Sequence, residues 1–154
     1  MPLEIERKFL VNGDGWKRNA SEPVRICQKY IPLGAGVKEV IRLRIAGDSA
    51  FLTLKTKQTG CVRGEYEYGI PVKDAEELMK VFCPGGAVEK LRYRVLHDGF
   101  LWVVDEFLGG YGGLVLAEIE LKSADETFAF PPWIGREVTG DFHYSNSWLA
   151  ENAK

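Results

Sequence analysis

Hydrophobic and polar residues alternate with a period of two along most of this 154-residue chain. Such alternation is typical of β-strands with one buried face, because successive side chains point to opposite sides of a sheet. Glycine-containing turns such as Gly47-Asp48 and Asp98-Gly99 separate several of these segments, and short connections favour antiparallel neighbours. The pattern predicts eight strands, at residues 3–11, 24–32, 38–47, 50–58, 61–71, 88–97, 100–107 and 113–122.

Three helices are predicted between and after these strands. One covers residues 74–82 and has Asp74 as its N-cap. A short helix begins at Ser123, and the last covers about residues 145–152. Eight strands in a chain of this length favour a closed or nearly closed barrel. We therefore expect an α+β fold, an eight-stranded antiparallel β-barrel with flanking helices, in one domain spanning 1–154.

The polar face of these strands is strongly charged. For a single strand, a solvated outer face is the usual meaning of such a pattern. Here it repeats over six strands, and acids and bases are largely segregated by strand, which indicates a barrel interior lined by charge. Like charges two residues apart repel each other, so a polyanionic substrate with metal ions would compensate both sets. The alternating charged residues are Glu4, Glu6 and Lys8; Arg42 and Arg44; Lys55 and Lys57; Arg63, Glu65 and Glu67; Lys90, Arg92 and Arg94; and Glu118 and Glu120.

Composition narrows the class of function. The formal net charge is −2, so overall charge gives no reason to expect nucleic acid or an anionic membrane as a partner. We find no signal peptide and no apolar run long enough to span a bilayer. Cys27, Cys61 and Cys83 are odd in number and widely spaced, which favours free thiols in a cytoplasmic protein. His97 and His143 are the only histidines, which argues against a histidine-built zinc site.

Two E-x-E pairs, Glu4/Glu6 and Glu118/Glu120, indicate a site for a divalent cation. Each pair places two carboxylates on one strand face, about 6.6–7 Å apart along the strand. Mg²⁺ is typically held by a few carboxylates together with substrate phosphates. Asp105, on the strand before the second pair, is a fifth candidate ligand.

Several motifs occur together in a characteristic order. They are Glu4-Ile5-Glu6-Arg7-Lys8 (E-x-E-x-K), Gln28-Lys29-Tyr30 (Q-x-Y), Arg42-Leu43-Arg44 (R-x-R), Leu52–Lys57 (L-T-x-K-x-K), Arg63–Glu67 (R-x-E-x-E), Lys90-Leu91-Arg92 (K-x-R), Glu118-Ile119-Glu120 (E-x-E) and Tyr144-Ser145-Asn146. This series resembles the CYTH superfamily, the triphosphate tunnel metalloenzymes, in its short bacterial form, over nearly the whole chain. One departure is Phe142-His143, where short members often carry Lys or Arg before the terminal motif.

The resemblance implies an eight-stranded antiparallel tunnel that hydrolyses or rearranges triphosphates with Mg²⁺ or Mn²⁺, two ions in all. Carried over by motif, Glu6, Glu118 and Glu120 would hold the metal that grips the triphosphate. Glu4 and Asp105 would hold a second metal near the attacking water, and Tyr30 next to Lys8 would position that nucleophile. The phosphate cradle would consist of Lys8, Arg42, Arg44, Lys55, Lys57, Arg63, Lys90 and Arg92.

The resemblance leaves several activities open. An inorganic tripolyphosphatase is the leading expectation, because the shortest bacterial members are most often linked to inorganic triphosphate. The alternatives are a thiamine or nucleoside triphosphatase, a class IV adenylate cyclase, and a non-catalytic polyphosphate-binding module. The expected partner is a small triphosphate, with neither nucleic acid nor membrane. The oligomeric state stays open, a homodimer included.

Overall fold

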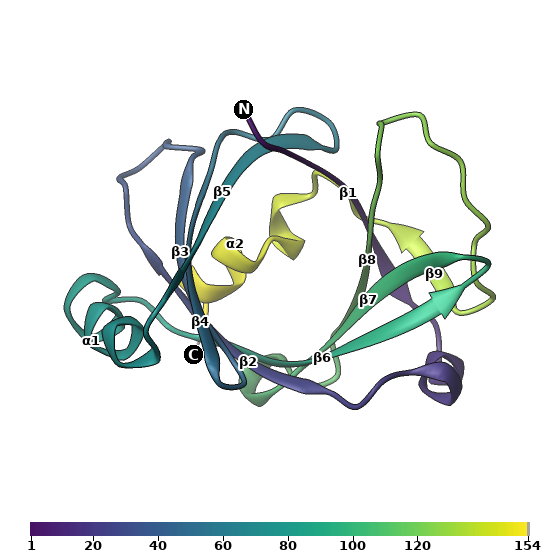
Figure 1. The fold of residues 1–154 in the computed structure, drawn as a ribbon, viewed down its shortest axis with the longest axis horizontal. Helices are drawn as coiled ribbons and strands as arrows, with labels where there is room; N and C mark the ends of the chain where they lie inside the picture. The colour runs from purple at the N-terminus through teal and green to yellow at the C-terminus, as the bar shows by residue number, and fades with distance from the viewer. Residues whose placement is uncertain (154) are drawn as a thin grey trace.

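Nine antiparallel strands and two α-helices make up the computed structural model, which describes residues 1–153 (Figure 1). Eight strands close into a barrel in the order β5-β4-β3-β2-β6-β7-β8-β1, and β1 pairs with β5 to complete the ring. The predicted eight-stranded antiparallel barrel is therefore confirmed. The strands are β1 (Leu3–Val11), β2 (Val24–Ile31), β3 (Val40–Ala46), β4 (Ser49–Lys55), β5 (Val62–Ile70), β6 (Val88–His97), β7 (Phe100–Phe107), β8 (Val115–Glu120) and β9 (Ile134–Glu137).

Strand β1 closes the barrel by dividing one of its edges between two partners. Its first residues pair with β5, from Leu3 opposite Gly64 to Ile5 opposite Val62. Beyond that point β9 takes over the same edge, with Phe9 opposite Glu137. The other edge of β1 pairs with β8 throughout, from Glu6 to Leu10. The acidic and basic side chains of β1 therefore lie next to three other strands, β5, β8 and β9.

The β6–β7 hairpin shows how a local turn fixes the position of distant side chains. Asp98 and Gly99 have φ values of 50° and 78°, as the two central residues of a type I′ turn require. A two-residue turn leaves His97 opposite Phe100, and counting back along both strands places Arg92 opposite Asp105. The register of two site residues therefore follows from one turn.

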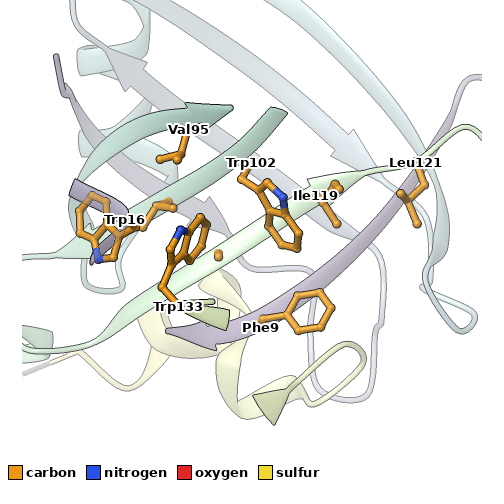
Figure 2. Close-up of a cluster of buried hydrophobic side chains, with 9 residues drawn as sticks. Phe9, Trp16, Val95, Trp102, Ile119, Leu121 and Trp133 are labelled. Carbon is orange, nitrogen blue, oxygen red and sulfur yellow. The ribbon is translucent and has the colours of Figure 1, made fainter. Parts of the chain in front are cut away.

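The main apolar core lies outside the barrel wall, against β1, β6, β7 and β8 (Figure 2). Trp102 packs edge to face against Phe9 and Trp133, with ring centroids 5.6 Å and 5.8 Å away. The segment between β8 and β9 and the 3₁₀ helix η1 (Gly15–Asn19) cover this core, and Trp16 of η1 is fully buried there. Because the apolar face points outwards into these covers, the charged face of the same strands points into the barrel.

Helix α1 (Val72–Phe82) packs on the outside of the barrel against β2, β3 and β4. Met79 of the helix and its C-cap residue Cys83 pack against Leu43, which is 0% exposed. The helix begins two residues before the predicted start, and Pro71 rather than Asp74 occupies the N-cap. Proline fits this position because its fixed φ suits a helix start and a missing N–H costs nothing there.

Helix α2 (Asn146–Glu151) fills one end of the barrel interior, where Figure 1 shows it within the ring of strands. Leu149 and Ala150 of α2 pack against Val88, Phe107 and Leu116, which project inwards from β6, β7 and β8. Ser145 caps the helix by accepting a hydrogen bond from the Trp148 amide. The barrel interior therefore has an apolar end at α2 and a charged remainder.

Two features differ from the sequence-based expectations. The short helix expected at Ser123 is wrong: that residue lies in a turn, and the chain continues without regular structure to Pro132. The Ser123 hydroxyl donates to Asp125 Oδ1, whereas a helix N-cap accepts from a backbone N–H. Strand β9 was not expected, because its four residues are too short for a period-two signal. No helix among residues 1–153 is long and apolar enough to cross a membrane.

Candidate active site

The inward face of the barrel gathers acids and bases from seven of its eight strands, and β2 contributes the neutral side chains of Gln28 and Tyr30. Of the residues predicted for the site, all except Lys57 lie within strands; Lys57 follows the end of β4 and is exposed. The inward-facing predicted residues are Glu4, Glu6 and Lys8 (β1), Tyr30 (β2), Arg42 and Arg44 (β3), Lys55 (β4), Arg63 (β5), Lys90 and Arg92 (β6), Asp105 (β7), and Glu118 and Glu120 (β8).

Asp105 is the centre of a buried ion-pair cluster. Its Oδ2 lies 2.8 Å from Lys90 Nζ, and Arg92 donates to both carboxylate oxygens, at 2.8 Å and 2.9 Å. Burial opposes ionisation of Asp105, but the charges of Lys90 and Arg92 outweigh it and hold the pKa of this carboxyl below its usual value. Burial lowers the pKa of Lys90, which is 0% exposed. Both Asp105 oxygens are thus occupied by bases of the same site.

A second set of ion pairs joins β1 to β4 and β8. Lys55 Nζ lies 3.1 Å from Glu4 and 3.2 Å from Glu65, so one base bridges two acids. Lys8 Nζ lies 3.6 Å from Glu118 and also donates to the Tyr144 carbonyl, at 3.1 Å. Burial opposes the charge of Lys8, but Glu118 and Glu6 raise its pKa above the ordinary value. Acids and bases of different strands therefore neutralise part of one another's charge. From the sequence, we expected a bound substrate with metal ions to do this.

The arginines of β3 are less well compensated. Arg42 is 5% exposed, donates to Thr53 Oγ1 at 3.3 Å and lies 3.5 Å from Glu67, yet its Nε has no hydrogen-bond partner. Arg44 donates from Nε to the neutral amide of Gln28, at 2.9 Å. Burial and the charges of Arg42 and Arg92 lower the pKa of Arg44 to about 10. The interior thus contains a buried cationic donor, Arg42 Nε, that still needs an acceptor.

Carboxylates gather where β1 and β8 pair. Glu6 lies directly opposite Glu120, and the next inward pair is Lys8 opposite Glu118. Burial, with the charges of Glu118 and Glu4, raises the pKa of Glu6 well above its usual value. Burial and the charge of Glu4 also raise the pKa of Glu120. Carboxylates that repel one another in this way are stabilised by a shared cation.

The donor set fits a hard divalent cation through Glu6, Glu118 and Glu120, with Glu4 beside them, because Mg²⁺ and Mn²⁺ are bound by carboxylate oxygens. Within residues 1–153, no three acidic, histidine or cysteine side chains are already arranged as ligands. The reason is visible in the contacts: Glu4 and Glu118 each have a lysine partner, Lys55 and Lys8. A bound cation would take the place of these ammonium groups.

The site contains three further residues that were not predicted for it from the sequence. Glu65 shares Lys55 with Glu4, and its place on the charged face of β5 was the available signal. Gln28, two residues before Tyr30 on the same strand face, had a similar signal but carries no charge. Asn146 accepts from Lys90 Nζ at 2.8 Å. Nothing in the sequence pattern shows that its helix enters the barrel.

The unusual Phe142-His143 pair lies in the 3₁₀ helix η3 (Phe142–Tyr144), just before α2. The two rings stack with centroids 4.0 Å apart, and His143 lies 3.0 Å from Asp141. Both side chains are exposed. The contacts of this segment with the interior bases come instead from the Tyr144 carbonyl and from Asn146.

Comparison with known proteins places the chain in a family. A family model described as "CYTH domain" matches residues 2–147. An inorganic triphosphatase of Acetivibrio thermocellus is 47% identical over 152 residues, 99% of this chain and 96% of the relative. One of Nitrosomonas europaea is 42% identical over 150 residues, 96% of each. A solved inorganic triphosphatase structure is 39% identical, with a TM-score of 0.68 over 99% of this chain and 97% of that one. The chain belongs to the CYTH domain family.

Proposed function

We propose that this protein is an inorganic triphosphatase that hydrolyses tripolyphosphate with Mg²⁺ or Mn²⁺, using two ions. The observation that carries the proposal is the buried Nε of Arg42, a cationic donor without an acceptor inside a closed barrel. A phosphate oxygen supplies the missing acceptor, since Arg binds phosphate through charge-assisted hydrogen bonds. The two relatives at 47% and 42% identity, both named inorganic triphosphatases, support the same activity.

The bases would bind the phosphate chain from several sides. Arg44, held by a neutral amide, and Arg63, whose Nε donates to the Thr56 carbonyl at 3.0 Å, keep their charge free of a direct carboxylate contact. Lys8, Lys55, Lys90 and Arg92 have carboxylate partners that a triphosphate and its cations would in part replace. Lys57 follows the end of β4 and is exposed, so its part in the phosphate cradle rests on the motif alone.

The acids would hold the cations. Glu6, Glu118 and Glu120 would bind the ion that grips the triphosphate, and Glu4 would bind the second ion. Asp105, which the motif assigned to the same ion as Glu4, lies opposite Leu116 and therefore at the level of Leu10, six residues along β1 from Glu4. Its two oxygens bind Lys90 and Arg92, so Asp105 and Glu4 would not share one ion. A bound divalent cation neutralises developing charge on phosphoryl oxygens and lowers the pKa of bound water. Lys8 and the Tyr30 hydroxyl would orient the water whose oxygen forms the new bond to the terminal phosphorus, while the bond to the leaving pyrophosphate breaks and the water proton is released. We also place the protein in the cytoplasm, on the basis of its three scattered cysteines.

A phosphate-release panel tests the proposal. Tripolyphosphate, ATP and thiamine triphosphate are each incubated with the protein and Mg²⁺, with Mn²⁺, and with excess chelator. We expect phosphate release from tripolyphosphate above the other two, and none in chelator. Preference for ATP or thiamine triphosphate would assign a different triphosphatase, and cyclic AMP as product would assign a cyclase. Binding without release under any condition would show a polyphosphate-binding module and refute the proposal.

A further inference from the structure

Gln28 connects two residues of the site through a single buried side chain. It is 0% exposed, and both ends of its amide are in use. Oε1 accepts from Arg44 Nε at 2.9 Å, and Nε2 donates to the Tyr30 hydroxyl at 2.8 Å. The contacts cross from β2 to β3, where Gln28 and Arg44 are directly opposite each other. One side chain thus determines the position of a phosphate-binding base and of a candidate nucleophile-positioning hydroxyl.

The direction of these hydrogen bonds follows from the chemistry of the groups. An arginine Nε can only donate, so the atom facing it must be the amide oxygen. The amide nitrogen then faces Tyr30, and since it can only donate, the phenol oxygen must accept from it. The Tyr30 proton is therefore free for another acceptor. A carboxylate at position 28 would reverse this arrangement, because it would accept the phenol proton itself.

A neutral partner also leaves the charge of Arg44 available. The nearby bases with direct carboxylate partners give a comparison: Asp105 binds Arg92 at 2.8 Å, and Glu118 lies 3.6 Å from Lys8. Arg44 makes its side-chain hydrogen bond to an amide instead. The amide orients the guanidinium without neutralising it, so the full cationic charge can act on a phosphate.

We infer that Gln28 is a positioning residue, which aims the uncompensated Arg44 guanidinium at the phosphate chain and turns the Tyr30 hydroxyl proton towards the substrate. The inference rests on the proposed function, since it requires a triphosphate in the barrel. Through Arg44, Gln28 would affect the affinity for triphosphate, and through Tyr30 it would affect the rate of turnover. If Gln28 only filled space in the barrel wall, its replacement would change affinity and turnover only as far as it lowered stability.

Two substitutions separate these roles. Gln28→Met keeps the length of the side chain and removes both hydrogen bonds, while Gln28→Glu keeps the shape and adds a charge. The matched control is Gln58→Glu, since Gln58 is an exposed glutamine that bonds the Gly60 carbonyl outside the barrel. Dissociation constants for tripolyphosphate are measured by isothermal titration with Mg²⁺, and kcat and KM by phosphate release. Thermal melting of the ligand-free proteins reports stability.

We expect Gln28→Glu to weaken tripolyphosphate binding about tenfold to a hundredfold, the effect of losing one charge-assisted contact. Its ligand-free melting temperature should stay equal to that of the wild type or rise, because Arg44 gains a counter-ion. Gln28→Met should weaken binding at least threefold, and kcat should fall more in Gln28→Glu, where the Tyr30 proton is captured. Gln58→Glu should stay within about twofold of the wild type.

A change below threefold in the dissociation constant of Gln28→Met overturns the inference, even if Gln28→Glu fails to fold. So does a folded Gln28→Glu that binds tripolyphosphate as tightly as Gln28→Met. Failure of the proposed function is distinguishable from these results. A wild type that binds tripolyphosphate but releases no phosphate refutes the triphosphatase while the binding ratios still decide the role of Gln28. A wild type that binds none refutes both.

Discussion

Replacing Asp105 with asparagine tests whether the buried ion-pair cluster stabilises the barrel. The substitution keeps the shape of the side chain but removes the only carboxylate within 4.0 Å of the Lys90 ammonium among the described residues. The Lys90 side chain is 0% exposed and that of Arg92 is 20% exposed, so the loss of Asp105 would leave at least one buried charge without its carboxylate partner. Breaking a buried pair by removing one partner costs about 3–5 kcal/mol. At roughly 2–4 °C per kcal/mol for a domain of this size, the melting temperature should fall by roughly 6–20 °C.

The assay is differential scanning fluorimetry of metal-free protein, with Glu89→Gln as the control. Glu89 also pairs with an arginine, Arg25, but both side chains are exposed, and an exposed pair contributes about 0–1 kcal/mol. If Asp105 acted only as a metal ligand, its replacement would leave metal-free stability unchanged and weaken only the stabilisation by Mg²⁺. An Asp105→Asn protein that melts like Glu89→Gln would refute the reasoning on the cluster.

Three further outcomes follow from the structure. Arg42→Ala should weaken tripolyphosphate binding about tenfold to a hundredfold by titration calorimetry, and a change below about twofold would place this arginine outside the binding site. Glu118→Gln should remain folded but lose Mg²⁺-dependent phosphate release, because one ligand loses its charge; full activity would contradict the metal assignment. Leu43→Ala should lose about 2–5 kcal/mol in denaturant unfolding, whereas Leu54→Ala, 38% exposed, should lose clearly less; equal losses would contradict the placement of the core.

Most of the fold could be predicted from the sequence, because local rules govern it. Period-two alternation located the eight barrel strands to within a few residues. The two-residue turn at Asp98-Gly99 also sets the register in which Arg92 faces Asp105. The helix expected at Ser123 did not form, and the Ser123 hydroxyl bonds the Asp125 carboxylate instead of capping a helix.

The pairing of acids with bases could not be predicted in the same way. Glu118 meets Lys8 because β8 and β1 become neighbours at closure, and no short turn connects these strands. Lys90 bonds Asn146 because a C-terminal helix enters the barrel, which depends on the packing of Leu149 rather than on any charge pattern. The sequence therefore identified the charged residues of the site, while their partners depended on long-range topology.

The closure of the ring between β1 and β5 has a consequence for dynamics. This ladder contains three paired residues, fewer than any other pair of adjacent barrel strands, and its central pair is Glu4 opposite Arg63. Short ladders open most readily, so amide hydrogens along Leu3–Ile5 should exchange with solvent faster than those of β6 and β7. Because an acid and a base of the site lie on opposite sides of this seam, a bound cation and phosphate chain would join its two sides. Protection from exchange on ligand binding should therefore be largest where the barrel closes.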